Sequence, residues 1–167
     1  MNTVCVHGLG HIGLPTAAML AAAGHDVVGC DTNPAVVAQV AAGRAGLREP
    51  GLDALLARAL RDGRLRAQAM PAPAAFHLIA VPTPCLAGQL PDLRCVEAAT
   101  DALAPLLRPG DTVILESTVP VGTTEALAAR LRSLRPDLRM PGEVAIAYCP
   151  ERVLPGRILQ ELSLIHI

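Results

Sequence analysis

The sequence has almost no aromatic residues, with one Phe, one Tyr and no Trp among its 167 residues. Proteins that hold single-stranded nucleic acid by base stacking need an aromatic platform, so this class of function is disfavoured. A formal net charge of −1 gives no general attraction for polyanions or acidic membrane surfaces. The core must therefore be aliphatic, and we expect small-molecule partners and no nucleic acid.

Lysine is absent, because all fourteen basic residues are arginine. A mechanism that needs a lysine amine as acid, base or Schiff-base former cannot be completed by this chain alone. The cysteines are odd in number and show neither a CxxC pair nor Cys/His ligand spacing, which predicts no disulfide framework and no metal site. They are Cys5, Cys30, Cys85, Cys95 and Cys149. This cysteine usage fits a reducing cytoplasm.

Long apolar runs are also missing. No stretch approaches the roughly 18 residues that a membrane span requires, and the first residues lead into an apolar strand without a charged leader. We therefore expect neither secretion nor membrane insertion. The chain does have 51% apolar residues and a mean hydropathy of +0.41, which is enough for one domain with a buried core.

Short apolar runs alternate with helix-like stretches along the chain. The pattern predicts strands at 3–7, 27–30, 65–68, 76–81, 112–115 and 144–148, and helices at 13–23, 34–43, 52–61, 93–107 and 123–134. Asn33 and Asp92 are the expected caps of the second and fourth helices. Such an alternation indicates a parallel sheet covered on both faces, a doubly wound α/β fold of the Rossmann type. These sheets bind ligands beyond the carboxyl ends of their strands.

A glycine-rich turn joins the first strand to the first helix, because residues 8–13 form a complete G-x-G-x-x-G motif. Gly8 permits the tight turn, Gly10 lets a pyrophosphate approach the backbone, and Gly13 allows the helix to pack closely on the strand. Asp31 ends the second strand about 20 residues further on, where a carboxylate can accept hydrogen bonds from an adenosine ribose. It would repel a 2′-phosphate and no arginine directly follows it, so NAD is favoured over NADP. The alternative interpretation is a glycine turn with a surface aspartate.

Polar side chains also follow three later strands. Val81-Pro82-Thr83 and Ser117-Thr118 place hydroxyls at two strand ends, where they either bond the nicotinamide half of a dinucleotide or cap turns. Glu151, just beyond the last strand, is either a base or a solvated loop acid.

The histidines and cysteines near the glycine motif have plainer interpretations. His11 is expected to line the pocket and His7 to pack at the end of its strand. Cys5 and Cys30 are expected to be small core residues.

Six runs of the sequence form a recognisable set: 8–18, 28–31, 49–52, 79–84, 113–118 and 147–156. Together they resemble the NAD-binding half of the UDP-glucose/GDP-mannose dehydrogenase family, and the resemblance covers residues 1–162. The most specific run contains Cys149-Pro150-Glu151-Arg152-Val153. It is similar to the members that act on UDP-N-acetyl-D-mannosamine, since the UDP-glucose enzymes usually carry an Asn-Pro-Glu-Phe type sequence there.

The resemblance implies an oxidoreductase. Family members oxidise the primary alcohol of a nucleotide sugar twice, with two NAD⁺, through an aldehyde and a cysteine-bound thioester that water hydrolyses. The expected product is UDP-N-acetyl-D-mannosaminuronate, a uronic acid for surface polysaccharide.

The resemblance also implies roles for individual residues. Asp31 would hold the adenosine ribose, and the contacts to NAD would come from His11, Ile12, Thr83 and Thr118. Glu151, with Thr118, would organise or activate water. The residues expected to touch the UDP-sugar are Arg152 and Val153. His11 is a departure, because the family more often has Tyr at this position.

A larger departure concerns the catalytic groups. The family's nucleophilic Cys and its catalytic Lys and Asn lie further along, in a central helix and a second nucleotide-sugar domain. None of the five cysteines inherits the nucleophile's role, so we expect this chain to be inactive alone. The central helix also makes most of the family's dimer contacts, which implies a homodimer for the full-length protein.

The last residues differ from the family pattern. The stretch 163–167 reads Ser-Leu-Ile-His-Ile, and we expect a non-native tail on a truncated gene, the domain itself occupying 1–162. A natural short terminus is the alternative. Two other functions stay open: a stand-alone NAD-binding module without catalysis, and the same fragment of a UDP-glucose 6-dehydrogenase.

Overall fold

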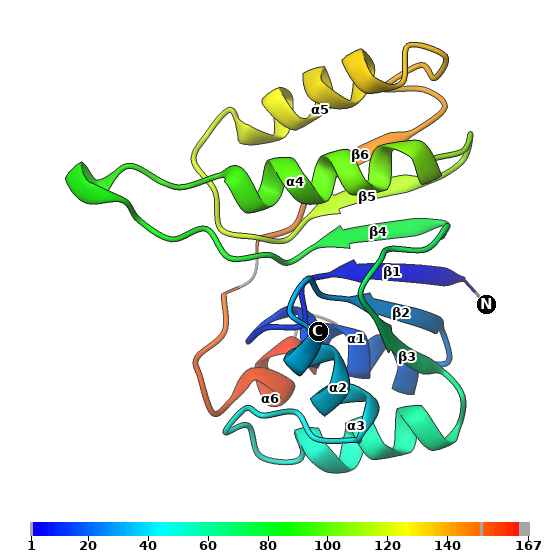
Figure 1. Ribbon diagram of the computed structural model, residues 1–167, viewed down its shortest axis with the longest axis vertical. Helices are drawn as coiled ribbons and strands as arrows, with labels where there is room; N and C mark the ends of the chain where they lie inside the picture. Colours follow the sequence, from blue (N-terminus) through cyan, green and yellow to red (C-terminus); the bar gives the residue numbers. More distant parts are fainter. Residues whose placement is uncertain (1, 151, 164–167) are drawn as a thin grey trace.

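Six parallel strands form one sheet in the computed structural model, which describes residues 2–150 and 152–163. The strands are β1 (Thr3–His7), β2 (Asp26–Cys30), β3 (Leu65–Gln68), β4 (Phe76–Ile79), β5 (Thr112–Leu115) and β6 (Ala145–Tyr148). Their order across the sheet is β3-β2-β1-β4-β5-β6, and every neighbouring pair is parallel. The strand order therefore reverses between β1 and β4 (Figure 1). Doubly wound sheets bind ligands at this switch point.

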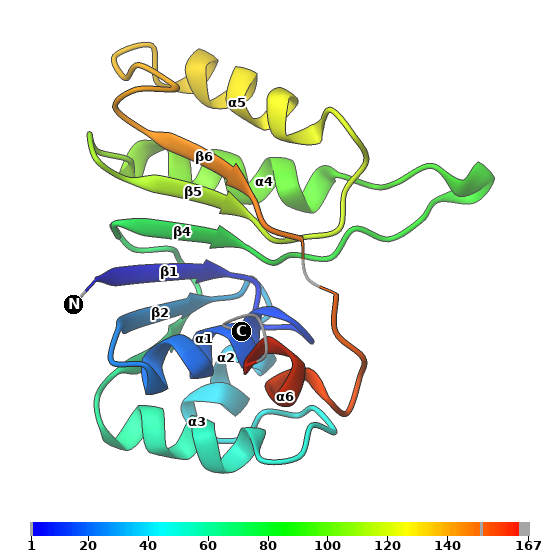
Figure 2. The same cartoon turned by 180° about the vertical axis from the view of Figure 1, so that it is seen from behind.

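Helices lie on both faces of the sheet. They are α1 (Gly13–Ala22), α2 (Pro34–Ala41), α3 (Leu52–Arg61), α4 (Arg94–Leu103), α5 (Thr123–Leu134) and α6 (Ile158–Ser163), with 3-10 turns η1 (Ala87–Gln89) and η2 (Ala104–Leu106). Helix α4 lies in front of the sheet in Figure 1, whereas α1 and α6 lie in front in the reverse view of Figure 2. The doubly wound α/β prediction is confirmed. Among the described residues, no helix combines the length and apolar character needed to cross a membrane.

The two faces of the sheet carry separate aliphatic cores, because side chains alternate along each strand. On one face, Val4 and Val6 of β1 pack with buried residues of α1 and α3. On the other face, Val113 and Leu115 of β5 pack with buried residues of α4 and α5. Alternation also means that Cys5 of β1 points away from the α1 core.

Of the two expected helix caps, the structure confirms Asn33 but not Asp92. The Asn33 side chain accepts a hydrogen bond from Ala35 N at 2.9 Å, with Pro34 at the first helical position. Helix α4 begins at Arg94, one residue later than predicted, so its N-cap residue is Leu93, which makes no side-chain cap hydrogen bond. Asp92 lies one residue before the cap, and its Oδ1 accepts a hydrogen bond from Arg94 N at 3.1 Å.

Four predicted elements end earlier than expected, and one helix was not predicted. Helices α1 and α2 end at Ala22 and Ala41, one and two residues early. Strand β4 stops at Ile79, where the N–H groups of Glu116 and Ser117 both donate to the Ile79 carbonyl, at 2.9 and 3.0 Å. Helix α4 ends at Leu103, because Pro105 has no N–H with which to continue it. Helix α6 lies beyond the last strand, where the sequence pattern gave no helix signal.

Two leucines of α5 offer a matched test of the second core. Leu131 is fully buried, whereas Leu134 is 45% exposed. Leu131→Ala should lower the free energy of unfolding by about 2–5 kcal/mol, because it leaves a cavity between α5 and β5. Leu134→Ala should change it by no more than about 0.5 kcal/mol. Urea denaturation of both variants measures the difference, and equal losses would contradict this description of the core.

Candidate functional site

The glycine-rich turn brings β1, β4 and α1 into close contact. Gly8 has a φ of +93°, and a Cβ placed on it would lie 2.6 Å from Ala80 O. A Cβ on Gly13 would lie 1.9 Å from Gly8 O and 3.1 Å from the Ala80 Cβ. Real Cβ atoms do not approach this closely, so side chains are excluded at both positions. The structure thus gives Gly8 and Gly13 the geometry expected of a tight turn and of close packing.

Gly10 differs from the other two glycines of the motif. A Cβ there would meet nothing within 4 Å, and Gly10 is exposed. Next to it, α1 begins with Ile12 as its N-cap residue and without a side-chain cap hydrogen bond. Backbone N–H groups at such a helix start attract anions, so this side of the turn suits a phosphate group.

Asp31 links the turn to the end of β2. Its Oδ2 accepts a hydrogen bond from Leu9 N at 2.9 Å, and its Oδ1 accepts one from Asn33 N at 2.8 Å. A carboxylate has about four acceptor sites, so two bonds to the backbone leave capacity for ribose hydroxyls. The carboxylate therefore both fixes the glycine turn and faces the ligand side of the sheet.

A first hollow of about 250 Å³ lies beside Asp31 on the α4 face of the sheet. Its walls come from the ends of β1 and β2, from Val81 and Pro82 after β4, from the crossover 69–71 and from α4. The α4 residues on this wall are small: Cys95, Ala98, Ala99 and Ala102. A narrow space between apolar walls with one carboxylate at its edge suits a flat heterocycle that carries a ribose.

A second hollow of about 320 Å³ lies on the other side of the same turn. It also contains Val81 and Pro82, and it continues to the end of β5 and to the segment after β6. Its remaining lining residues are Ile12, Ala80, Thr83, Glu116, Ser117, Thr118, Arg152 and Val153. Because the two hollows share a wall and flank the glycine turn, they suit the two halves of one dinucleotide.

Hydroxyls at the strand ends hold the wall of the second hollow together. Ser117 Oγ donates to Val81 O at 2.8 Å, and it lies 3.2 Å from Ile79 O. Thr83 Oγ1 donates to Thr118 O at 2.7 Å. These bonds tie the end of β4 to the end of β5. Within the chain, the hydroxyls of Ser117 and Thr83 therefore make the turn-capping contacts that were one of their two expected roles.

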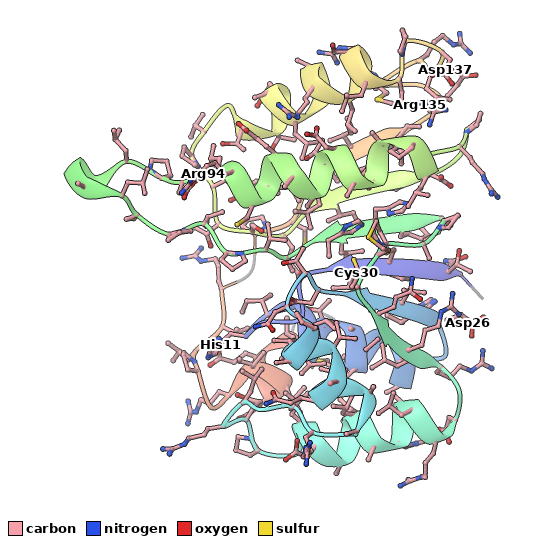
Figure 3. The ribbon with its side chains drawn as sticks, viewed as in Figure 1. His11, Asp26, Cys30, Arg94, Arg135 and Asp137 are labelled. Carbon is pink, nitrogen blue, oxygen red and sulfur yellow. The ribbon has the colours of Figure 1, made fainter. Side chains whose placement is uncertain are left out.

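The remaining predicted site residues differ in their places. His11 is exposed beside the turn (Figure 3) and is not among the residues that line either hollow, contrary to the expectation that it lines the pocket. Arg152 is exposed at the rim of the second hollow, next to the half-buried Val153. Glu151, the expected acid or base, lies outside the described residues.

Two carboxylates that were not singled out as site residues are buried here. Glu116 lines the second hollow and accepts a hydrogen bond from Thr16 Oγ1 of α1 at 3.0 Å. Glu49 accepts from Gly156 N at 2.9 Å and from Leu159 N at 3.3 Å, which fastens the chain after β6 to the segment before α3. The sequence signals were their places in the runs 113–118 and 49–52 and, for Glu116, its position directly after a predicted strand, where doubly wound sheets bind ligands.

Comparisons with known proteins agree with this geometry. The family described as the UDP-glucose/GDP-mannose dehydrogenase family, NAD binding domain, matches residues 2–166. The NDP-N-acetyl-D-galactosaminuronic acid dehydrogenase of Ralstonia nicotianae is 49% identical, and the UDP-N-acetyl-D-mannosamine dehydrogenase of Salmonella typhi is 47% identical. Each alignment covers 96% of this chain and 40% of the relative. The chain thus spans about two fifths of the length of these relatives.

A solved structure is similar over the same region. The UDP-D-ManNAc dehydrogenase of Pyrococcus horikoshii superimposes with a TM-score of 0.92 at 40% sequence identity. The match covers 96% of this chain and 38% of that one.

The contrast between Gly13 and Gly10 can be tested with the same substitution. Gly13→Ala should destabilise the fold by about 3 kcal/mol, because the new methyl group overlaps the Gly8 carbonyl. Gly10→Ala should stay within about 0.5 kcal/mol of the unaltered protein, since Gly10 lacks a positive φ and its Cβ meets open space. Thermal and urea unfolding of the two variants measure the change in the free energy of unfolding. A larger loss for Gly10→Ala than for Gly13→Ala would contradict the conclusion that Gly13 is closely packed and Gly10 faces open space.

Proposed function

Since the chain belongs to the UDP-glucose/GDP-mannose dehydrogenase family and forms its NAD-binding domain, we propose that it holds the cofactor for the oxidation of UDP-N-acetyl-D-mannosamine to UDP-N-acetyl-D-mannosaminuronate. The observation that carries this proposal is the pair of hollows that meet at the glycine turn. When bound there, NAD⁺ supplies the hydride acceptor for the two-step oxidation of an alcohol to a carboxylate.

The cofactor would lie across the turn with one half in each hollow. Its adenosine half fits the first hollow, with the ribose hydroxyls on Asp31. Its pyrophosphate fits the open side of Gly10 at the start of α1, which the close contacts of Gly8 and Gly13 hold in position. Its nicotinamide half fits the second hollow, where the proposed contacts are Ile12, Val81, Pro82, Thr83, Ser117 and Thr118. The proposed contact from His11 would come from the exposed side of the turn, outside this hollow.

The charge on Asp31 favours NAD over NADP. A 2′-phosphate on the adenosine ribose would lie against the Asp31 carboxylate, and two neighbouring negative charges repel each other. The residues that directly follow Asp31 are Thr32, Asn33 and Pro34, which offer no guanidinium to a phosphate.

The sugar substrate would enter beside the nicotinamide half. Arg152 and Val153 border the second hollow and are the proposed sugar contacts. We infer that Glu151, together with Thr118, organises the water that hydrolyses the oxidised intermediate. A nucleotide N-acetylgalactosamine is a second candidate substrate for the same site, because the Ralstonia relative is named an NDP-N-acetyl-D-galactosaminuronic acid dehydrogenase.

The complete reaction needs groups that this chain does not carry. It contains no lysine, and its family resemblance assigns the nucleophile to none of its cysteines. We infer that residues of the full-length protein outside this chain supply the catalytic lysine and the nucleophilic cysteine. The same outside residues would form the contacts of the homodimer.

The role of Asp31 can be tested through cofactor selectivity. Asp31→Asn should weaken NAD binding by about 1–3 kcal/mol, because charge-assisted hydrogen bonds to the ribose are lost. It should also narrow the preference for NAD over NADP, because the repulsion of the 2′-phosphate disappears. Calorimetric titration of both cofactors measures the two effects.

A matched control separates these effects from damage to the turn. Asp26 lies at the opposite end of β2, where it pairs with Arg64 at 2.7 Å (Figure 3). Asp26→Asn should leave both affinities unchanged. If Asp31→Asn weakened NAD and NADP by the same factor, the carboxylate would only be holding Leu9 and Asn33, and the ribose role would be withdrawn.

The proposal that this chain binds the cofactor but does not complete the oxidation can be tested directly. The 167-residue chain, mixed with NAD⁺ and UDP-N-acetyl-D-mannosamine, should bind the cofactor without forming NADH. Calorimetry and NADH fluorescence on the same sample measure the two properties. NADH formation would show that the chain already holds every group the oxidation needs, and no NAD binding would reject the cofactor role itself.

A further inference from the structure

Two cysteines and two histidines meet on the α4 face of the sheet. Cys5 and His7 lie two residues apart on β1, so they point to the same side. The strand register places Cys30 of β2 opposite His7 and His77 of β4 opposite Cys5. Residues separated by up to 72 positions in the sequence therefore share one patch, which we call the Cys/His cluster: Cys5, His7, Cys30 and His77.

The Cys/His cluster is buried and closely spaced. Cys5 and His77 are fully buried, and His7 and Cys30 are 3% and 5% exposed. One potential ligand atom from each of Cys5, His7 and Cys30 lies within 4.8 Å of the other two. His7 Nε2 lies 3.2 Å from His77 Nδ1, in hydrogen-bond contact. Figure 3 shows Cys30 on the side of the sheet that faces α4.

Packing alone does not account for these residues. The surrounding surface is apolar, formed by Val28, Ala72 and Ala74, and His77 Nε2 has no hydrogen-bond partner among the described residues. Buried polar atoms without partners are rare and costly.

We propose that Cys5, His7 and Cys30 form a binding site for one thiophilic metal ion of the Zn²⁺ class, with His77 as a positioning residue. Two thiolates and an imidazole are a ligand set typical of zinc. A metal-bound histidine usually donates its other ring N–H to a second group, and His77 Nδ1 lies where the His7 ring can do so. Spacing along the chain predicts no metal site, because the ligands come from two different strands.

A disulfide between the two cysteines fits this patch less well. Cys5 pairs with Val28 in the register, and Cys30 lies two residues further along β2. Neighbouring strands lie about 4.8 Å apart and each residue advances about 3.3 Å along a strand, so the Cα atoms of such a diagonal pair are about 8 Å apart. Disulfides usually span about 4.4–6.8 Å between Cα atoms. A metal ion between the sulfur atoms removes this limit.

The proposed site adjoins the cofactor pocket without sharing its chemistry. His7 and Cys30 line the first hollow, so a bound ion would form part of the floor beneath the adenosine half. The second hollow, which would hold the nicotinamide, contains none of the four residues. The ion would thus stabilise the central strands and shape the adenosine pocket, with no part in hydride transfer.

Cobalt titration tests the proposal without altering the Cys/His cluster. The probe is Co²⁺, whose thiolate complexes absorb in the near ultraviolet, added to the chain in which the exposed Cys85, Cys95 and Cys149 are replaced by serine. We expect one Co²⁺ per chain, a thiolate-to-cobalt charge-transfer band, and displacement of that band by Zn²⁺. A folded triple variant without this band would overturn the proposal, and no NAD is present, so the result is independent of the cofactor assignment.

Single substitutions in the same background assign the ligands. Cys30→Ser should abolish most of the band, and His77→Phe should weaken Co²⁺ binding about 10- to 100-fold while keeping the two-thiolate band. His25→Phe, directly before β2 at its other end, is the matched control and should change nothing. Equal Co²⁺ affinity in His77→Phe and the control would remove His77 from the site, and an undiminished band in Cys30→Ser would overturn the site itself.

Discussion

The close approach of α1 to the ends of β1 and β4 is the constraint on which the site depends. It exists only because Gly8 and Gly13 have no side chains where the Gly8 carbonyl and Ala80 already fill the space. The same turn is fixed to β2 by Gly8 N on the Cys30 carbonyl at 2.8 Å and by Leu9 N on Asp31. One compact turn thus sets the distance between the two hollows and aims the start of α1 at the space between them.

The second hollow depends on a different set of contacts, which join segments far apart in the sequence. The Ser117 hydroxyl donates to the Val81 carbonyl and the Thr83 hydroxyl donates to the Thr118 carbonyl, so the loops after β4 and β5 form one connected wall. Glu49 then fastens the chain that returns from β6 to the segment before α3. Within the chain, the hydroxyls of Ser117 and Thr83 bond to the backbone of the neighbouring loop, and the wall they build is the surface that a ligand would meet.

The two faces of the sheet differ in what they bury. The α1 face is continuous aliphatic packing, which suits helices that approach closely through alanine-rich surfaces. On the α4 face, small residues of α4 and the crossover 69–71 leave the first hollow open, and Cys5, His7, Cys30 and His77 take the place of aliphatic residues beneath it. This face therefore combines a hollow with a polar floor, which aliphatic packing alone would not produce.

Local sequence determined most of the fold, because β1, α3, β3, β5 and α5 have the predicted bounds and Asn33 caps α2 as expected. It also located the glycine turn and Asp31, since a turn, a cap or a strand end is a property of neighbouring residues. It did not predict α6, the anchoring role of Glu49 or the Cys/His cluster. Those depend on residues about 20 to 110 positions apart, such as His7 with Cys30, His7 with His77 and Glu49 with Gly156, and only the strand order and register decide which of them meet.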